Sequence, residues 1–576
     1  MSVQSVSNLD NFFTISRKIA KGFLQSVVVI DDQATFDEIK PTQEQADELV
    51  IPVTSGGRPG TQFEPNTVSE TNTEQDLYVK QLNDCFADNG LVCGVLKPTQ
   101  HDMSTISTKA NHVARRADIV VFDWILRKEE PGGETALKSI VAILEGDENK
   151  MIEGIPQSRM RLIAIYTSEP DLSSIVKKVV DFLKGEGITF KRKRGDDFTL
   201  CKQGASIVFY RKDRGSKTKE KERSRTVTED KLVNCLIDDF TKMTYGLLSN
   251  TALYSLGALR DNTHRILRKF ENRLDASYLT HYTLALEDEA KEHPIPLLTS
   301  EFNDILKDCE VDKNASLDTV TKWIEHKINA KDIIKDSEIN DITNEEFKTV
   351  LLDIIKNGKN AKQESYSIIE KNDNKIKSWR NKQLKILRKK DTNSKITGLL
   401  INDQSAEVRD LDFAILTTMR SQYNEPKPVL SLGSVVAQTS KRKTSYYVCI
   451  QPPCDSVRLT ENTVFPFLKL YQMDLSDEKY GFDIVFFDKD KYHKLKISLK
   501  PRDICLFTLK VDSFNEIRAT VDSKKAYIFE TFKIKQNLRW VATLKFAHAQ
   551  RIANDFARET SRVGLTESEW LRKMSS

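Results

Sequence analysis

The chain has 576 residues, of which 39% are hydrophobic and 30% charged, so we expect roughly two to four folded domains rather than a disordered chain. Its 88 basic and 84 acidic residues leave a net charge of only +4, so the charge balance by itself does not indicate a nucleic-acid-binding protein. The eight cysteines are scattered and form no CxxC pair, which argues against a zinc site or a disulfide framework. No apolar run reaches the roughly 18 residues of a membrane span, and no signal-peptide core follows the first residues, so we expect a cytoplasmic protein without a membrane segment.

Short apolar runs alternate with helical periodicity over the first third of the chain. The run Ser26 to Ile30 (SVVVI) is β-branched and almost wholly apolar, which is typical of a strand covered on both faces of a parallel sheet. The same pattern predicts a doubly wound, right-handed α/β sheet. Its further strands are expected at 91–96, 118–122, 161–166 and 206–210, and its helices at 76–87, 134–144 and 172–183. The polar segment at about 33–74, which is rich in Gly and Pro near residues 56–60, is interpreted as a loop or an insertion.

Four of the five predicted strands are followed by side chains with useful chemistry. Asp31 and Asp32 follow the first strand, Asp123 the third, Thr167 the fourth and Lys212 the fifth. Because functional groups collect at the carboxyl ends of the strands in an open α/β sheet, we expect these side chains to lie together. Three neighbouring carboxylates repel one another unless a cation is present, and Mg²⁺ prefers oxygen ligands. The pattern therefore predicts a Mg²⁺ site.

The set VVVIDD, DIVVFDW, IAIYTS and IVFYRK resembles the receiver domain of two-component response regulators over residues 20 to 215. The resemblance implies a flavodoxin-like receiver sheet whose acidic pocket binds Mg²⁺ and accepts a phosphoryl group. It implies Asp31 and Asp32 as metal ligands and Asp123 as the phosphoryl acceptor, which also contacts the metal. A histidine kinase, or an ATPase-type protein, is the implied partner.

The resemblance also implies roles for the later strand ends. Thr167 becomes the switch hydroxyl, Lys212 the cation that contacts the phosphoryl oxygens, and Phe209 the aromatic switch. Lys191, in ITFKRK, is a rival for the lysine role, and Asp213 stands where the family has proline. The long gap between the fourth and fifth strands leaves room for an inserted β-hairpin around Ile188 to Cys201. In these departures the sequence resembles the receivers of larger multidomain bacterial proteins, some of them linked to stress or phage defence.

The remaining chain divides by composition into three parts. Residues 216–425 carry long helical periodicity with few Gly or Pro and are expected to form a helical domain. Residues 426–538 contain short apolar or alternating runs between turn residues, which predicts a small β-barrel or sandwich. Residues 539–576 are expected to be a C-terminal helical segment. The α/β domain then covers residues 1–215.

Two hypotheses for function come from these patterns. In the first, phosphorylation of Asp123 controls the helical and β output regions, so the protein is a regulator. Its only enzymatic chemistry would then be its own phosphorylation and dephosphorylation. In the second, the receiver is degenerate and the chain is a non-catalytic adaptor for a partner protein or nucleic acid. The basic segments 191–194 and 211–225 are the candidate nucleic-acid contacts, against the alternative of a solvated surface. A homodimer stays open.

Overall fold

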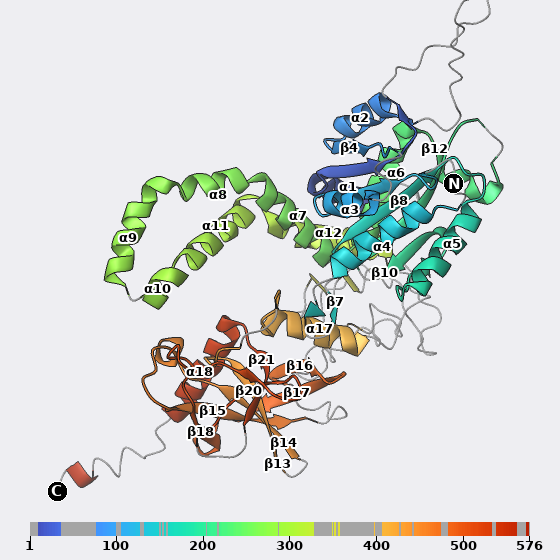
Figure 1. The fold of residues 1–576 in the computed structure, drawn as a ribbon. Helices are drawn as coiled ribbons and strands as arrows, with labels where there is room; N and C mark the ends of the chain where they lie inside the picture. Colours follow the sequence, from blue (N-terminus) through green and yellow to red (C-terminus); the bar gives the residue numbers. More distant parts are fainter. Residues whose placement is uncertain are drawn as a thin grey trace, which may run out of the picture. The chain divides into compact units, whose positions relative to one another are not determined.

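The computed structural model of the chain divides into two compact units, Met1–His326 and Lys327–Ser576 (Figure 1). Each unit is described by itself below. The structure describes residues 10–35, 77–99, 105–126, 132–148, 151–152, 155–156, 159–202, 204–215, 218–285, 287–327, 348, 351–352, 355–356, 397, 406–424, 428–440, 443–473, 482–532, 537–561 and 572–574.

The first unit is built on an eight-stranded sheet in the order β4-β1-β5-β8-β11-β10-β9, with β12 paired to β11. The five strands from β4 to β11 run parallel, and the order of their appearance along the chain reverses beside β1, as in a doubly wound fold. The expected parallel α/β sheet is therefore present. These five strands are β1 (Ser26–Ile30), β4 (Val92–Leu96), β5 (Ile119–Phe122), β8 (Arg161–Thr167) and β11 (Ala205–Lys212).

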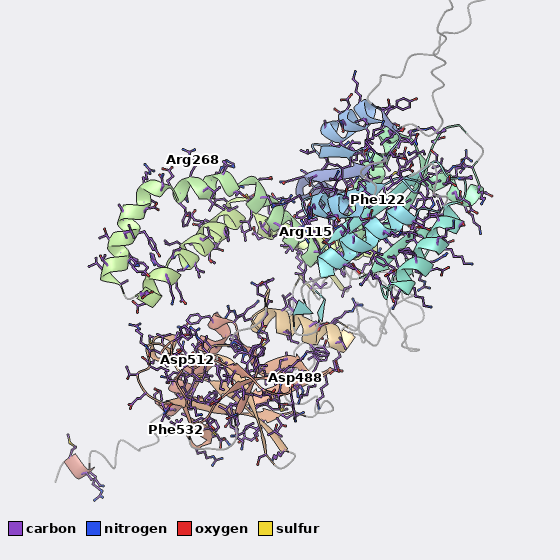
Figure 2. All side chains as sticks on the ribbon, in the orientation of Figure 1. Arg115, Phe122, Arg268, Asp488, Asp512 and Phe532 are labelled. Atoms are coloured by element: carbon purple, nitrogen blue, oxygen red, sulfur yellow. The ribbon has the colours of Figure 1, made fainter. Side chains whose placement is uncertain are left out.

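Helices cover both faces of this sheet because successive strand residues point to opposite sides. One face packs on α3 (Ile106–Ala114), α4 (Glu134–Glu148) and α5 (Leu172–Gly185). Phe122, labelled in Figure 2, belongs to that core. The other face packs on α1 (Asp10–Phe23), α2 (Val79–Asp88) and α6 (Glu229–Thr244).

Several elements differ from the sequence-based expectation or extend it. Helices α1 and α3 were not predicted, whereas the inserted hairpin is present as β9 (Lys191–Lys193) and β10 (Asp196–Lys202). The expected loop at 33–74 lies almost wholly outside the described residues. Its two ends meet, because β2 (Ala34–Thr35) pairs in parallel with β3 (Leu77–Tyr78).

Beyond the sheet, the first unit continues as helices. α6 belongs to the covering of the sheet, since its apolar residues join the core formed by β1, β5, β8 and β11. The division of the α/β and helical domains at residue 215 stays a prediction. The chain then forms an arm in which α7 and α11 pack side by side (Figure 1). The arm comprises α7 (Leu247–Asp261), α8 (Thr263–Lys269), α9 (Asp275–Leu284), α10 (Glu287–Glu292), α11 (Pro294–Asp308) and α12 (Leu317–Lys327).

The second unit contains a nine-stranded antiparallel sheet in the order β16-β17-β15-β14-β13-β21-β20-β19, with β18 paired to β15. The sheet curves strongly, because the backbone bridge between Leu509 and Thr531 also brings β18 beside the end of β20. One core, containing Phe465 and Phe467, fills the inside of this curve, and a second core packs on the other side of the sheet. The predicted β-rich region is therefore present. Its longer strands are β13 (Ser434–Ser440), β14 (Lys443–Cys449), β15 (Thr463–Gln472), β16 (Ile484–Asp488), β17 (Lys491–Ile497) and β18 (Ile504–Leu509). The shorter ones are β19 (Thr520–Val521) and β20 (Tyr527–Phe529).

The C-terminal segment corrects one expectation. Residues Leu538–Thr543 form strand β21 rather than helix, and the helix α18 covers Phe546–Thr560. The strand forms there because Leu538 and Trp540, two residues apart, both point into the core on the inside of the curved sheet. Helix α17 (Ala406–Thr418) precedes the sheet. Among the described helices, none combines the length and the apolar character that crossing a bilayer requires.

Candidate functional site

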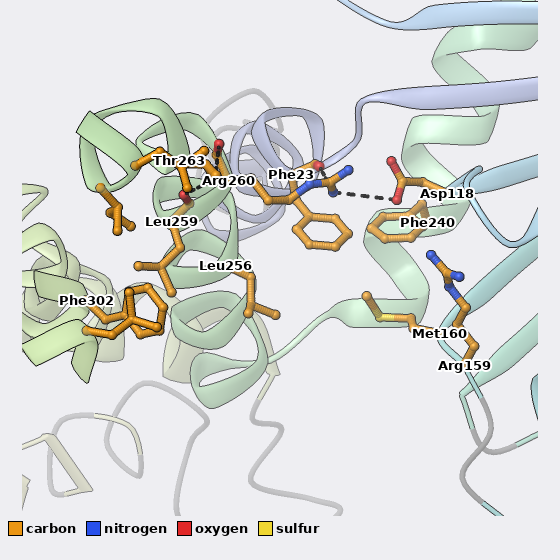
Figure 3. A pocket seen from close by; sticks show the side chains of 13 residues that line it. Phe23, Asp118, Arg159, Met160, Phe240, Leu256, Leu259, Arg260, Thr263 and Phe302 are labelled. Atoms are coloured by element: carbon orange, nitrogen blue, oxygen red, sulfur yellow. Dashed lines mark hydrogen bonds and ion pairs between the residues drawn. The ribbon is translucent and has the colours of Figure 1, made fainter. Parts of the chain in front are cut away.

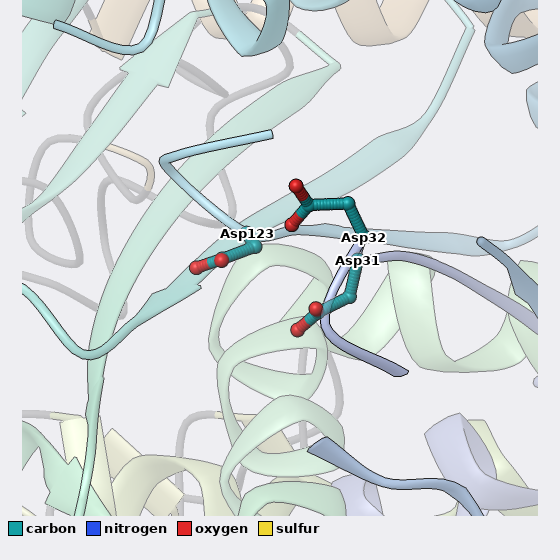
Figure 4. A group of neighbouring side chains, drawn as sticks. All are labelled: Asp31, Asp32 and Asp123. Carbon is teal, nitrogen blue, oxygen red and sulfur yellow. The ribbon is translucent and has the colours of Figure 1, made fainter. Parts of the chain in front are cut away.

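Three carboxylates gather at the carboxyl end of the parallel sheet in the first unit. Each of Asp31, Asp32 and Asp123 offers an oxygen, and these three atoms lie within 4.8 Å of one another. Figure 4 shows the three side chains at the ends of the neighbouring strands β1 and β5. Asp31 and Asp123 are buried, with 1% and 8% exposure. Oxygen donors at this spacing fit a hard divalent cation better than a soft one.

The Asp31 side chain is fixed by the backbone around it. Its own N–H donates to the carbonyl of Leu96 on β4 at 3.1 Å, which extends the β1–β4 pairing by one residue. One carboxylate oxygen accepts from the N–H of Gln33 at 2.8 Å, and this turn leads directly into β2. The position of Asp31 therefore follows from the end of β1 and from the pairing of β2 with β3.

Asp123 follows the fully buried strand β5. Its N–H donates to the carbonyl of Ile30 at 2.9 Å, and its carboxylate accepts from the N–H of Trp124 at 2.9 Å. The Trp124 ring lies against Gly133, where a Cβ atom would come within 2.4 Å of the indole and where φ is +74°. Glycine is therefore required at the point where the chain enters α4.

Lys212 supplies the positive charge of the cluster. Its ammonium donates to Asp31 Oδ2 at 2.8 Å and lies 3.8 Å from Asp123 Oδ1, while the side chain is 1% exposed. Burial alone would lower the pKa of Lys212, but the carboxylates of Asp123 and Asp31 raise it above its usual value. The lysine therefore stays protonated among the acids.

Burial raises the pKa of Asp123 to about 7, with Asp31 and Asp32 adding to the increase and Lys212 opposing it. One lysine thus does not neutralise three neighbouring carboxylates. A divalent cation among them would remove the remaining repulsion. The donor set and the charge both fit such an ion.

The remaining residues predicted for the site are Thr167, Phe209 and Lys191, and they lie in different parts of the receiver sheet. Thr167 is buried at the end of β8, and its Oγ1 accepts from the N–H of Glu169 at 3.2 Å. Ser168, beside it, has a buried hydroxyl oxygen without a hydrogen-bond partner among the described residues. Phe209 is fully buried in the core facing α3, α4 and α5. Lys191 is exposed on the β9–β10 hairpin, whereas Lys212 lies in the acid cluster.

The family model of the response receiver domain matches residues 23–217. The first unit contains a receiver domain. The match covers all five parallel strands and the acid cluster, and it ends before α6. No curated protein and no solved structure matches the chain.

The receiver domain is joined to α6 by side chains that were not singled out from the sequence. Tyr166, next to Thr167, lies under the Lys212 ammonium at 5.7 Å from its ring centre. The Tyr166 hydroxyl donates to the carbonyl of Val227 at 3.1 Å, two residues before α6. Arg214, two residues after Lys212, forms two hydrogen bonds with the Glu229 carboxylate, at 3.1 and 2.5 Å. Glu229 is the first residue of α6, so both contacts connect the site to that helix.

A second buried network holds the middle of α6. Arg225 lies 2.5 Å from Asp196 of β10 and 2.7 Å from Asp239 of α6, and the Tyr210 hydroxyl donates to the same Asp239 carboxylate. Burial would raise the pKa of Asp239, but Arg225 and Lys242 hold it below its usual value. The signal for this network was the charge-rich sequence at 211–225, for which we expected either nucleic-acid contacts or a solvated surface. Arg225 and Lys212 from that stretch are buried and ion-paired, so they are not available to phosphate backbones.

Figure 3 shows an apolar pocket of about 680 Å³ where the arm meets the receiver domain. Arg260 of α7 crosses its rim, donating to the carbonyl of Phe23 at 3.0 Å and lying 3.6 Å from Asp118. Asp118 precedes β5, which carries Asp123 at its other end. The arm thus contacts the receiver domain through α7.

Proposed function

We propose that this chain is a cytoplasmic regulator whose receiver domain accepts a phosphoryl group on Asp123 and passes the change to α6 and the helical arm. The observation that carries the proposal is the placement of Lys212 between Asp31 and Asp123 at the carboxyl end of the sheet. Such a cluster pairs an oxygen nucleophile with a fixed positive charge, which is what phosphoryl transfer requires.

Each residue then has a defined task. A carboxylate oxygen of Asp123 attacks the phosphorus, and the bond to the donor, a phosphohistidine of a partner kinase or acetyl phosphate, breaks. Asp31, Asp32 and Asp123 would hold Mg²⁺, which supplies positive charge to the phosphoryl oxygens. Lys212 gives up its hydrogen bond to Asp31 and turns to the new phosphoryl group. The hydroxyls of Thr167 and Ser168, at the end of β8, are the candidate hydrogen-bond donors to the phosphoryl oxygens. Water then attacks the phosphorus of the acyl phosphate, and the bond to Asp123 breaks, which releases inorganic phosphate and regenerates the carboxylate.

The output follows from the contacts around Lys212. Any movement of Lys212 changes its contact with the Tyr166 ring, and Tyr166 and Arg214 both hold the start of α6. Phe209 points to the opposite face from α6, so in this proposal the tyrosine and arginine side chains transmit the change. Phe209 as a switch stays a prediction.

The test uses the full chain with acetyl phosphate and Mg²⁺. We expect the intact mass to rise by one phosphoryl group, and hydrogen exchange to change at the start of α6. Asp123→Asn removes both effects. Asp88→Asn, which deletes an exposed carboxylate at the end of α2, is the matched control and keeps both. A wild-type chain that gains no mass with either acetyl phosphate or a phosphorylated kinase would contradict the proposal.

A second candidate function, that of a partner-binding adaptor, is favoured by the arm. It exposes several large apolar side chains, as protein-binding surfaces do. They include Leu248, Leu256, Leu267, Phe270, Leu279, Leu284, Ile295 and Leu297. Light scattering of the full chain, with and without acetyl phosphate, tests whether this surface joins two copies. A mass of one chain under both conditions would leave a different protein as the occupant, or none.

A further inference from the structure

A second charged site lies in the β unit, far along the chain from the receiver domain. A cavity of about 520 Å³ opens on the sheet where β14, β15 and β17 neighbour one another. Tyr446 of β14 pairs with Leu470 of β15, which in turn pairs with Ile497 of β17. Most of the groups around the cavity are polar. They are Lys443, Thr444, Ser445, Tyr446, Lys469, Tyr471, Gln472, Lys491 and His493, with Leu470.

Three of the residues that line this cavity are lysines. In the described part of the chain, Lys443, Lys469 and Lys491 form no ion pair, and the Lys469 ammonium instead lies 5.2 Å from the centre of the Tyr471 ring. By contrast, Lys494 on the same strand is paired with Glu407 at 2.5 Å. Asp488, which pairs with Lys491 across the β16–β17 turn, is itself bound by Arg539 at 3.1 and 2.8 Å. Asp503, which accepts from the Tyr471 hydroxyl at 3.3 Å and acts electrostatically on Lys469, offsets part of this charge, whereas Lys443 and Lys491 have no ion-paired carboxylate among the described residues.

His493 provides the second, independent observation. Its side chain is 4% exposed and lies between the rings of Phe486 and Tyr446, with centroids at 5.1 and 5.5 Å. One ring nitrogen, Nδ1, lies 3.4 Å from the Tyr446 hydroxyl. The other, Nε2, is buried and has no hydrogen-bond partner in the described residues. A buried polar atom without a partner is costly, and here it belongs to a residue that lines the cavity.

The protonation state of the His493 ring allows its Nε2 to act as a hydrogen-bond donor. Burial and the neighbouring Lys491 lower its pKa, with Asp488 opposing them, so the ring is neutral at neutral pH. If the Tyr446 hydroxyl donates to Nδ1, the proton of the neutral ring resides on Nε2. That N–H then becomes a hydrogen-bond donor for an acceptor group in the cavity.

We propose that this cavity binds a small molecule that carries a phosphate or diphosphate group. Lysine ammoniums, hydroxyls and an N–H donor together match the oxygens of a phosphate. The volume lies within the range of about 300–1,000 Å³ that small-molecule pockets occupy. Tyr471, 43% exposed at the same cavity, offers a ring face for an aromatic base, so a nucleotide is the ligand that uses all of these groups.

The test is calorimetric titration of the full chain with sodium pyrophosphate and, separately, with ATP. EDTA is present so that the receiver domain takes no part through a metal. Both probes are expected to bind with one site per chain, and Lys443→Gln with Lys491→Gln weakens both at least tenfold. Both lysines are exposed, so this double variant keeps the fold. Lys500→Gln, an exposed lysine just after β17 that does not line the cavity, is the control and binds as the wild type does.

Two more variants divide the site. His493→Gln is expected to weaken both probes, and Tyr471→Ala to remove only the advantage of ATP over pyrophosphate. Failure of both probes to bind overturns the proposal, as does unchanged binding in the double lysine variant. An oligothymidylate that binds where pyrophosphate and ATP do not also overturns it, in favour of a nucleic-acid surface. Asp123→Asn leaves the binding intact, so this result is separate from that of the receiver domain.

Discussion

In the receiver unit, buried basic side chains lie between carboxylates, whereas in the β unit three lysines face one cavity with no carboxylate partner among the described residues. Lys212 lies between Asp31 and Asp123, and Arg225 lies between Asp196 and Asp239. In the first arrangement each basic side chain is ion-paired with buried acids, and these pairs can therefore hold a structure together. In the second arrangement the lysines form no ion pair among the described residues, and a group of like charges is useful mainly when a ligand of the opposite sign binds. The contrast predicts that equivalent substitutions will act on stability in one unit and on binding in the other.

The largest effect is expected from Lys212→Met. This change leaves the buried carboxylates of Asp31 and Asp123 without their cation, and removing one partner of a buried ion pair costs about 3–5 kcal/mol. Two measurements report this loss of stability: the free energy of unfolding in urea and the rate of hydrogen exchange in β1 and β5. Millimolar Mg²⁺ should recover part of it if the acids bind the ion. If Mg²⁺ restores no stability to Lys212→Met, while the added change Asp31→Asn restores all of it, the cluster is stabilised by its lysine alone and does not bind the ion.

Arg225→Met should also be strongly destabilising, by roughly 3 kcal/mol, since it leaves Asp196 and Asp239 without their buried partner. The loss should appear first as faster hydrogen exchange in α6 and β10, because these are the elements that Arg225 joins. Arg223→Met, an exposed residue two positions earlier, is the matched control. Equal effects of the two variants would show that the network contributes little.

Arg214→Gln should act more locally. The Arg214–Glu229 pair is partly buried and charge-assisted, so its loss costs about 1.5–3 kcal/mol at most. The expected result is faster exchange at the first turn of α6, with the sheet unchanged. In the phosphorylation assay this variant should gain the phosphoryl group normally but show a smaller change at α6. An unaltered response would remove Arg214 from the route between the site and the helix.

The smallest effect on stability is expected from the double variant with Lys443→Gln and Lys491→Gln. Exposed side chains without ion pairs usually change stability by within about 0.5 kcal/mol, and here relief of repulsion would make the sign favourable. The unfolding temperature of the β unit should therefore be unchanged or slightly raised. A clear loss of stability would mean that these lysines are structural, and would end the contrast between the two units.

The α/β sheet could be predicted from the sequence because its strands are nearly continuous apolar runs. SVVVI, DIVVF, RLIAIY and SIVFY each ended within two residues of the observed strand, and their polar followers marked the site. The neighbourhood of Asp31, Asp123 and Lys212 follows from sheet topology alone, since parallel strands present their carboxyl ends at one edge. Lys191, on the exposed edge hairpin, and Lys212 could not be distinguished without the register.

Other features depend on tertiary contacts that no local pattern encodes. Arg214 and Arg225 sit in a charged stretch that resembles a solvated linker, and only the fold brings Glu229, Asp196 and Asp239 to them. The LRWVAT segment carries both helical and strand character, and the inside of the β unit decides between them by burying Leu538 and Trp540. The lysine cavity likewise combines residues from three strands that are up to 50 positions apart, so its charge appears only after folding.

The parallel pairing of β2 with β3 has a practical consequence for engineering. Because Ala34 and Thr35 lie beside Leu77 and Tyr78, the residues that flank the segment 36–76 lie at adjacent points of the receiver domain. The entropic cost of a longer closed loop grows only slowly with length, about 0.6 kcal/mol for each doubling. A fluorescent reporter grafted between residues 36 and 76 would therefore be carried by a short stem, three residues from the acid pocket, without a redesign of the sheet. Evolution has the same freedom there to lengthen or exchange the segment while the chemistry beside it stays fixed.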